Sequence, residues 1–196
     1  MSGFKLTSDT LDVVPGAGSI EYNGQFFGTD SNNSRAQINR ITQGTAVAST
    51  SGTSINFTGI PSWVKRITVM FDGVSTSGAS PMAIQLGDSG GIENTGYIGA
   101  GGYYASGSTT AGLSSTAAML LQERSTALET NSGTAIISNL SGNTWVMSTT
   151  IGSSGNKLFT GGSSKSLSAT LDRIRITTAN GTDTFDAGSI NILYEG

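Results

Sequence analysis

The sequence contains no cysteine and no histidine among its 196 residues. Without cysteine the chain has no disulfides and no thiol chemistry. Without histidine it lacks the commonest general base and the commonest metal ligand, so neither a Ser-His-Asp nor a Cys-His arrangement can be built. These absences weigh against the main classes of nucleophilic enzyme, and we expect a protein that is not an enzyme.

Charge is also scarce. Only 12% of the residues are charged, the net charge is -3, and no basic run exists. Nucleic-acid-binding proteins normally show a clustered basic face, because phosphate neutralisation supplies much of their affinity. No apolar run approaches the ~20 residues that cross a bilayer, and the first ten residues lack the apolar core of a signal peptide. We therefore expect no nucleic-acid binding, no membrane insertion, and synthesis in a cytoplasm with release by a route other than secretion.

Carboxylates are the remaining acid–base groups, and they are spread thinly along the chain. Asp88 lies near Glu93, and Asp183 lies near Asp186, yet acidic residues in glycine-rich turns usually cap local backbone. Neither region has the alternating oxygen ligands of a calcium loop. The glycine pairs of the chain lack the lysine and the following helix of a phosphate-binding loop. We expect no catalytic residue, no metal and no cofactor.

Glycine, in contrast, is abundant, with 28 residues, and serine and threonine are frequent. Several short segments alternate apolar and polar residues; Ile67, Val69 and Phe71, for example, fall on one face of a strand. Many short strands separated by turn signals are typical of a sandwich or jelly roll. The sequence predicts an all-β fold, a jelly-roll-like antiparallel β-sandwich, with strands at 45–50, 53–58, 64–71, 82–86, 134–139, 144–150, 167–171, 173–177 and 189–194.

A short hairpin is predicted near the N-terminus, around Asn23-Gly24. Asn-Gly between two β-prone runs is a strong hairpin signal, because both turn residues must accept positive φ. A two-residue loop pairs Tyr22 with Gln25 and Ile20 with Phe27. In this register Ile20, Tyr22 and Phe27 share one face of the hairpin.

Phe26 and Glu21 occupy the other face in this register. A lone hairpin is at best marginally stable, so it needs a neighbour: the main domain, a sister subunit or another protein. Ile20, Tyr22, Phe26 and Phe27 are the candidate attachment residues.

The chain divides into an N-terminal attachment segment, residues 1–44, and a β-sandwich domain, residues 45–196. Within the first part, 31–34 is predicted to be a loop and 35–43 a connector. Residues 117–128 carry good helix formers without a cap or lasting periodicity. Helix and strand both stay open there, and the neighbouring pattern favours a strand.

The longest turn-rich stretch, 87–112, carries Tyr97, Tyr103 and Tyr104. We expect it to form loops at one end of the sandwich, with a second flexible stretch at 152–166. Exposed tyrosines stack on sugar rings and anchor interfaces at low entropic cost. Tyr97, Tyr103 and Tyr104 are therefore the candidate ligand-binding residues.

Two segments resemble structural proteins of tailed bacteriophages. Residues 6–28, LTSDTLDVVPGAGSIEYNGQFFG, are similar to a tail-fibre element in which proline and small residues precede an (I/L)E(Y/F)-x-G hairpin and an aromatic-Gly-Thr exit. Residues 51–97, followed by Asn143-Thr144-Trp145-Val146 and a closing GSINILYE, resemble a terminal β-domain of phage fibre-type proteins. The matching residues of the first element are Pro15, Gly18, Ile20, Glu21, Tyr22, Gly24, Phe27, Gly28 and Thr29.

This resemblance implies a structural virion protein, most of all a short tail fibre or tail-tip protein displayed as a homotrimer. Trimeric display raises weak binding to a host surface by avidity. The family further implies contacts between the N-terminal segment and other virion proteins, a host-surface glycan as ligand, and localisation in the virion after assembly in the bacterial cytoplasm.

Two alternatives stay open. Typical fibres carry a long shaft, which this chain lacks, so a shaft-bearing fibre is not expected. Beside the short tail fibre, a capsid decoration (cement) protein or a head fibre is the first alternative. The second alternative is a small glycan-binding lectin or a glycan-active enzyme.

Overall fold

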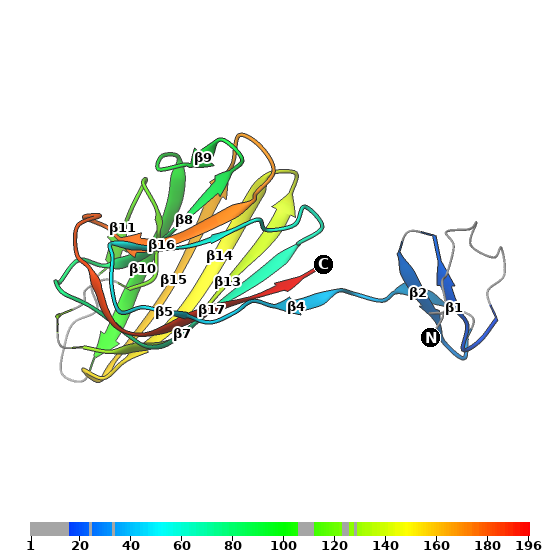
Figure 1. Cartoon of the computed structure of the whole chain (residues 1–196), viewed down its shortest axis with the longest axis horizontal. Coiled ribbons are helices and arrows are strands. Elements are labelled where there is room, and N and C mark those ends of the chain that lie inside the picture. Colours follow the sequence, from blue (N-terminus) through cyan, green and yellow to red (C-terminus); the bar gives the residue numbers. More distant parts are fainter. Residues whose placement is uncertain (1–15, 24, 33, 106–111, 123–125, 128) are drawn as a thin grey trace. The chain divides into compact units, whose positions relative to one another are not determined.

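A computed structural model describes residues 16–23, 25–32, 34–105, 112–122, 126–127 and 129–196. These residues form strands, turns and irregular segments, and none of them belongs to a helix that could cross a membrane. The chain divides into two compact units, Met1–Arg40 and Ile41–Gly196 (Figure 1). The predicted all-β sandwich is confirmed.

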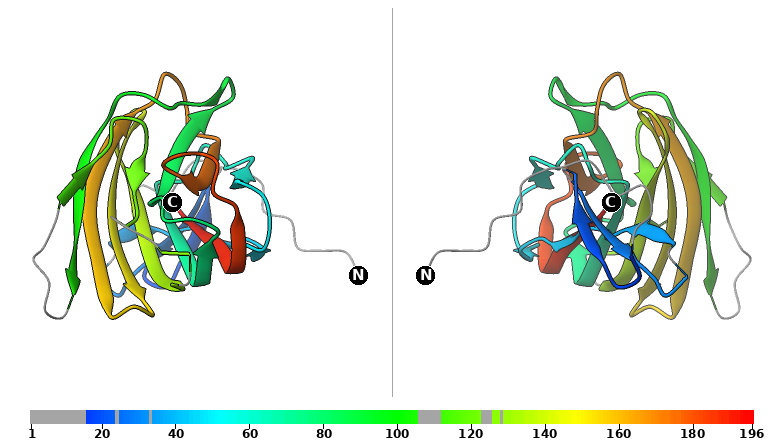
Figure 2. Two further views of the ribbon diagram at one scale, coloured as in Figure 1. Left: turned by 90° about the vertical axis from the view of Figure 1, so that its left-hand side faces the viewer. Right: turned by 90° about the vertical axis from the view of Figure 1, so that its right-hand side faces the viewer.

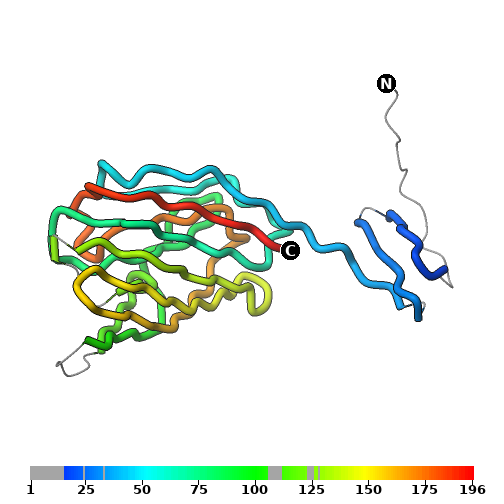
Figure 3. Tube along the Cα trace, turned by 90° about the horizontal axis from the view of Figure 1, so that it is seen from below, coloured from blue at the N-terminus to red at the C-terminus, as the bar shows by residue number. Residues whose placement is uncertain are grey.

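The second unit contains two antiparallel sheets. The larger sheet has nine strands in the order β11-β10-β15-β14-β13-β7-β17-β4, with β5 also paired to β17. Figure 3 shows β17 running between β4 and β7 on this sheet. The bounds are β4 Ile41–Gln43, β5 Val47–Ala48, β7 Arg66–Thr76, β10 Tyr97–Ala105, β11 Gly112–Ser114, β13 Asn131–Ser141, β14 Thr144–Ser153, β15 Lys157–Ser166 and β17 Phe185–Glu195.

The smaller sheet has five strands in the order β12-β8-β16-β6, with β9 also paired to β8. Their bounds are β6 Ser54–Thr58, β8 Met82–Asp88, β9 Gly91–Ile92, β12 Met119–Leu120 and β16 Arg173–Thr178.

The two sheets have jelly-roll connectivity. One half of the framework follows the order β4-β17-β7-β13 in the larger sheet, and the other half follows β6-β16-β8-β12 in the smaller sheet. Numbered along the chain, these eight strands read 1-8-3-6 and 2-7-4-5, the two interleaved Greek keys of a jelly roll. Strands β14, β15, β10 and β11 then extend the larger sheet beyond β13.

Figure 2 shows the two sheets facing each other, and the buried core residues lie between their inner faces. Ile67, Val69 and Phe71 of β7 are buried there, as their alternation predicts. They pack in one cluster with Ile174 and Ile176 of β16. Each fully buried side chain of this size contributes roughly 1.5–3 kcal/mol, so period-two burial on both sheets stabilises the sandwich.

Two stretches predicted as loops are strands. Residues 97–105 form β10 and residues 157–166 form β15, and the two pair along their whole length. Glycine at position 99 is required by close strand approach: a Cβ on Gly99 would lie 2.3 Å from Ser163 Oγ and 2.5 Å from the Gly162 carbonyl oxygen. Glycine here marks tightly packed strands, and the loop prediction was wrong.

One predicted strand, 167–171, is absent. Leu167 and Leu171 are buried, but their segment crosses from β15 of the larger sheet to β16 of the smaller one. Within 117–128, only Met119–Leu120 forms a strand among the described residues. The predicted positions 123–125 and 128 lie outside the described residues.

The N-terminal unit is a three-stranded antiparallel sheet, order β1-β2-β3. Its strands are β1 Ile20–Tyr22, β2 Phe26–Thr29 and β3 Arg35–Gln37. The predicted connector 35–43 therefore contains β3 and, after a short link, β4. Position 24 of the predicted hairpin turn lies outside the described residues.

The predicted hairpin register was wrong by one residue. Tyr22 pairs with Phe26, and Glu21 pairs with Phe27. The Asn23 N–H donates to the Gln25 carbonyl oxygen at 3.2 Å, so Gln25 belongs to the loop and not to the strand. A one-residue shift moves side chains to the opposite face, so Phe26 and Phe27 exchange sides relative to the prediction.

Candidate functional site

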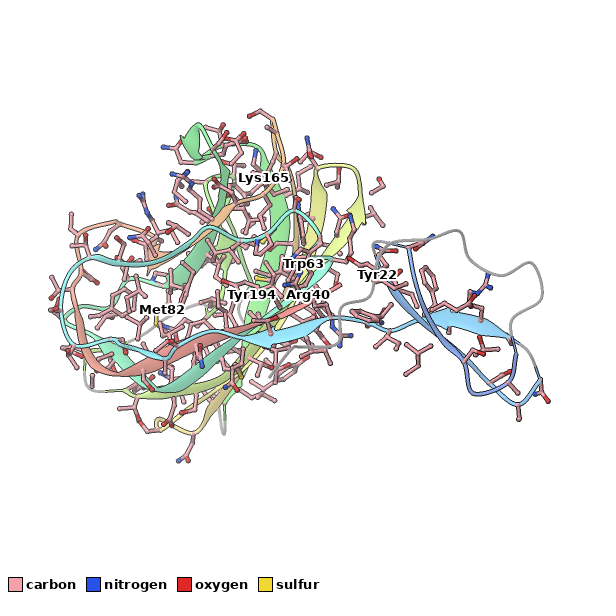
Figure 4. All side chains as sticks on the ribbon, turned by 45° about the vertical axis from the view of Figure 1, so that its right-hand side comes forward. Tyr22, Arg40, Trp63, Met82, Lys165 and Tyr194 are labelled. Carbon is pink, nitrogen blue, oxygen red and sulfur yellow. The ribbon has the colours of Figure 1, made fainter. Side chains whose placement is uncertain are left out.

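One face of the N-terminal sheet collects apolar side chains. Tyr22 (labelled in Figure 4) and Phe26 are register partners, and their rings lie 5.0 Å apart. The Ile38 N–H donates to the Phe26 carbonyl oxygen at 2.8 Å, which places Ile38 beside Phe26. We call this surface the apolar N-terminal face; it comprises Ile20, Tyr22, Phe26, Ala36 and Ile38.

The opposite face of the same sheet is polar and internally paired. Arg35 Nε donates to Glu21 Oε2 at 2.7 Å, and Arg35 Nη2 donates to Glu21 Oε1 at 3.1 Å. This two-pronged geometry is the strong form of an arginine–carboxylate pair. Phe27 lies on this side, between Glu21 and Gln37 in register, so it is not part of the apolar N-terminal face.

The apolar N-terminal face is exposed. Ile20 is 66% exposed, Phe26 46% and Ile38 51%. The unit Met1–Arg40 is small, and domains of about 40 residues or fewer usually need a further contact to be stable. Exposed apolar patches of this kind mark contact surfaces. The structure thus brings three of the four candidate attachment residues, Ile20, Tyr22 and Phe26, together on one apolar face.

Tyr97 is a structural residue and not a ligand-binding one. It is 1% exposed, its hydroxyl oxygen accepts from the Leu86 N–H at 2.8 Å, and its hydroxyl donates to the Glu93 carbonyl oxygen at 2.8 Å. Burial raises the pKa of Tyr97 to about 12. The ring is therefore held inside the sandwich and cannot stack on a ligand, which corrects the sequence prediction.

A charged cluster surrounds the Tyr97 ring. Lys165, labelled in Figure 4, is 5% exposed and forms an ion pair with Glu93. Its Nζ also lies 5.5 Å from the centre of the Tyr97 ring, within cation–π range. The Ser168 N–H donates to Glu93 Oε1 at 2.7 Å. We call Asp88, Glu93, Tyr97, Lys165 and Ser168 the Lys165 cluster.

The same cluster holds both carboxylates that sequence spacing offered as an acid–base pair. The Ser168 hydroxyl lies 2.7 Å from Asp88 Oδ2 and 2.8 Å from Glu93 Oε1. The hydrogen bond from Lys165 lowers the pKa of Glu93, and the hydrogen bond from Ser168 lowers the pKa of Asp88. A general acid needs a raised pKa, so this arrangement suits a structural clamp between β8, β15 and the loop before β10.

Tyr103 and Tyr104 point to opposite faces of β10. Tyr103 packs against the core, with its ring 5.8 Å from that of Phe159. Tyr104 is 60% exposed on the outer face, beside its register partner Leu158. All three candidate tyrosines therefore lie on β10 and not in a loop, and only Tyr104 is on the outer face, so they do not form one exposed cluster.

This separation predicts different effects for two single substitutions. Tyr103→Ala is expected to lower the free energy of unfolding by about 2 kcal/mol, because it removes ring packing against Phe159. Tyr104→Ala is expected to change it by less than about 0.5 kcal/mol, because the ring is mostly in solvent. Urea unfolding of both variants measures this, and equal effects would contradict the assignment of faces.

The second carboxylate pair is also engaged in local structure. Asp183 accepts from the Ser80 N–H at 3.0 Å and from Asn180 Nδ2 at 2.7 Å. Asp186 accepts a hydrogen bond from the Ser75 hydroxyl. Across the part of the chain that the structure describes, no group of three or more acidic side chains is placed to hold a metal ion.

Sequence reasoning missed a polar concavity on the outer face of the smaller sheet. It is an open hollow of roughly 300 Å³, and its floor comes from outward-facing positions of β6, β8 and β16. Its lining residues come from four separate segments, so the only signal in the sequence is polar side chains at alternate strand positions. They are Thr53, Ser54, Gln85, Ile92, Asn94, Arg175, Thr177, Thr178, Ala179, Asn180 and Gly181.

Comparison of the chain with protein-family models, with curated proteins and with solved structures gave no match. Two surfaces of the described residues bear on function: the apolar N-terminal face and the polar concavity.

Proposed function

We propose that this chain is a structural protein of a tailed-phage virion, a short tail fibre or tail-tip protein displayed as a homotrimer for binding to a host surface. The observation that carries the proposal is the apolar N-terminal face, which is exposed while the opposite face of the same sheet is paired. A sheet with one exposed apolar face and one internally paired face is suited to attach the sandwich domain to another protein surface.

We propose that the apolar N-terminal face of each copy packs against the same face of the sister copies. Each copy carries the same aromatic and aliphatic side chains, so association of copies buries apolar surface on every partner. The trimer itself is the expectation from the resemblance of residues 6–28 and 51–97 to phage fibre proteins. The second of these segments corresponds to strands β6 to β9 and the first residue of β10.

The chemistry of the sandwich agrees with a role in display. The carboxylates Asp88 and Glu93 are held by Ser168 and Lys165, and Asp183 and Asp186 accept hydrogen bonds from neighbouring residues. None of these four groups is placed as a free general acid or base. We therefore propose a binding role and no catalytic one.

Immunogold labelling of phage particles tests the proposal. Antibodies raised against the purified chain are expected to label the tail, and particles assembled without the chain serve as the control. Label distributed over the head would replace the tail assignment with capsid decoration or a head fibre. Particles that contain no copy of the chain would contradict a virion role.

A further inference from the structure

We propose that the polar concavity of the smaller sheet binds an acidic saccharide, with the sugar carboxylate on Arg175. Arg175 lies on β16, opposite Asn56 of β6 and Gln85 of β8 in register. It is therefore held in the middle of three hydrogen-bonded strands, where a rigid backbone fixes the direction of its side chain. Strand-borne groups bind ligands with less reorganisation than groups on loops.

The guanidinium of Arg175 has donors to offer. Arg175 Nε donates to Asn56 Oδ1 at 3.1 Å, and this neutral contact orients the side chain. Within the described ranges Arg175 takes part in none of the ion pairs, whereas Arg35, Arg66 and Arg173 each hold a carboxylate. A planar guanidinium with free terminal N–H groups matches the two oxygens of a carboxylate.

The rest of the lining suits the hydroxyl groups of a sugar. Gln85 Nε2 donates to the Ala117 carbonyl oxygen at 3.2 Å, which leaves Gln85 Oε1 as an acceptor. The Thr177 hydroxyl donates to the Thr53 carbonyl oxygen at 2.9 Å, so its oxygen can still accept. Asn94 at the rim is exposed and can both donate and accept. Ile92 supplies an apolar contact for the C–H side of a sugar ring.

The charge balance of the concavity selects an anion. Of the residues that line it in the described part of the chain, Arg175 alone carries a charge. No carboxylate among these lining residues competes for the Arg175 guanidinium or repels the carboxylate of a ligand. Neutral hydroxyls around a single fixed cation correspond to a uronic or sialic acid residue, in which one carboxylate accompanies several hydroxyl groups.

Titration calorimetry on the purified full chain tests the site. The probes are oligogalacturonate and oligosialate, each compared with its carboxyl-reduced counterpart, which keeps the hydroxyl groups and loses the charge. At least one acidic probe is expected to bind, and its reduced form is expected to bind at least about tenfold more weakly. Arg175→Gln is expected to weaken binding of the acidic probe by a similar factor, with an unchanged melting temperature.

Arg66→Gln is the matched control, because Arg66 is an arginine on the larger sheet that is paired with Glu195. It is expected to bind the acidic probe like the wild-type chain. Absence of binding by both acidic probes would overturn the proposal, and so would equal weakening by Arg175→Gln and Arg66→Gln. The role of the concavity in contacting the host rests on the proposed function. The two proposals fail in different experiments, because a chain that binds no acidic sugar is still expected to be labelled on the virion.

Discussion

Replacing Tyr22 and Phe26 by serine is expected to convert the proposed trimer into monomers. The two rings contact each other on the apolar N-terminal face, and Phe26 is 46% exposed in a single copy. Burial of an aromatic side chain of this size stabilises an interface by roughly 1.5–3 kcal/mol, and the double variant removes two such side chains from every copy. The loss recurs in all copies, so we expect complete dissociation at micromolar concentration.

Light scattering on the eluting protein measures this directly as molar mass. Leu140→Ser is the matched control: Leu140 is also a strongly exposed apolar residue, but it lies on β13 of the sandwich. This control is expected to keep the trimer mass. Circular dichroism should show an unchanged β signal in the double variant, because the sandwich core is not touched.

Two outcomes would contradict this account of the apolar N-terminal face. A double variant that stays trimeric would place the subunit contacts on the sandwich. A wild-type chain that is monomeric would remove the sister copies as the occupant of this face and leave another virion protein in that role.

Removing the charge of Glu93 is expected to cost about 2–3 kcal/mol of folding free energy. Glu93→Gln leaves Lys165, which is 5% exposed, without its counter-ion. An unpaired buried charge is strongly destabilising, and partial access of water on the Glu93 side moderates the penalty. Urea unfolding at neutral pH measures the effect.

The double variant Glu93→Gln with Lys165→Met separates charge from packing. Methionine keeps most of the apolar length of lysine and needs no counter-ion. We therefore expect the double variant to recover most of the stability lost in Glu93→Gln. If Glu93→Gln and the double variant lost the same amount of stability, the ion pair would not be what stabilises this part of the sandwich.

Acid is expected to weaken the same cluster. The pKa values of Glu93 and Asp88 are lowered in the folded state from ordinary values of 4.5 and 3.8. Their contribution to stability is therefore complete above pH ~4.5 and is lost as the pH falls through the folded-state values. Melting temperatures between pH 6 and pH 3 should fall less steeply in Glu93→Gln with Lys165→Met than in the wild-type chain.

The sequence predicted the jelly-roll framework well, because its strands bury one face. In β7, Ile67, Val69 and Phe71 alternate with polar or partly exposed residues. This alternation predicts a strand whatever the order of the strands in the sheet. In the extension of the larger sheet, β14 was predicted, but β10 and β15 were missed because they contain glycines where the strands approach closely. In a sequence, such glycines look the same as glycines of turns.

The candidate site was predictable only in part. Tyr22 and Phe26 were recognised as attachment residues, but the pairing error put Phe27 in place of Phe26 on the shared face. The Lys165 cluster depends on the register between β10 and β15, which sets Tyr97 opposite Lys165. Residues so far apart in the chain meet only through the pairing of their strands, and no local sequence pattern predicts that contact.

A cryo-electron microscopy map of the intact virion tests the central claim most directly. We expect three copies of the jelly roll at the tail, joined through their apolar N-terminal faces, with the smaller sheet of each copy open to solvent. A map in which every tail component is assigned to other chains, with this one absent from the particle, would contradict the account.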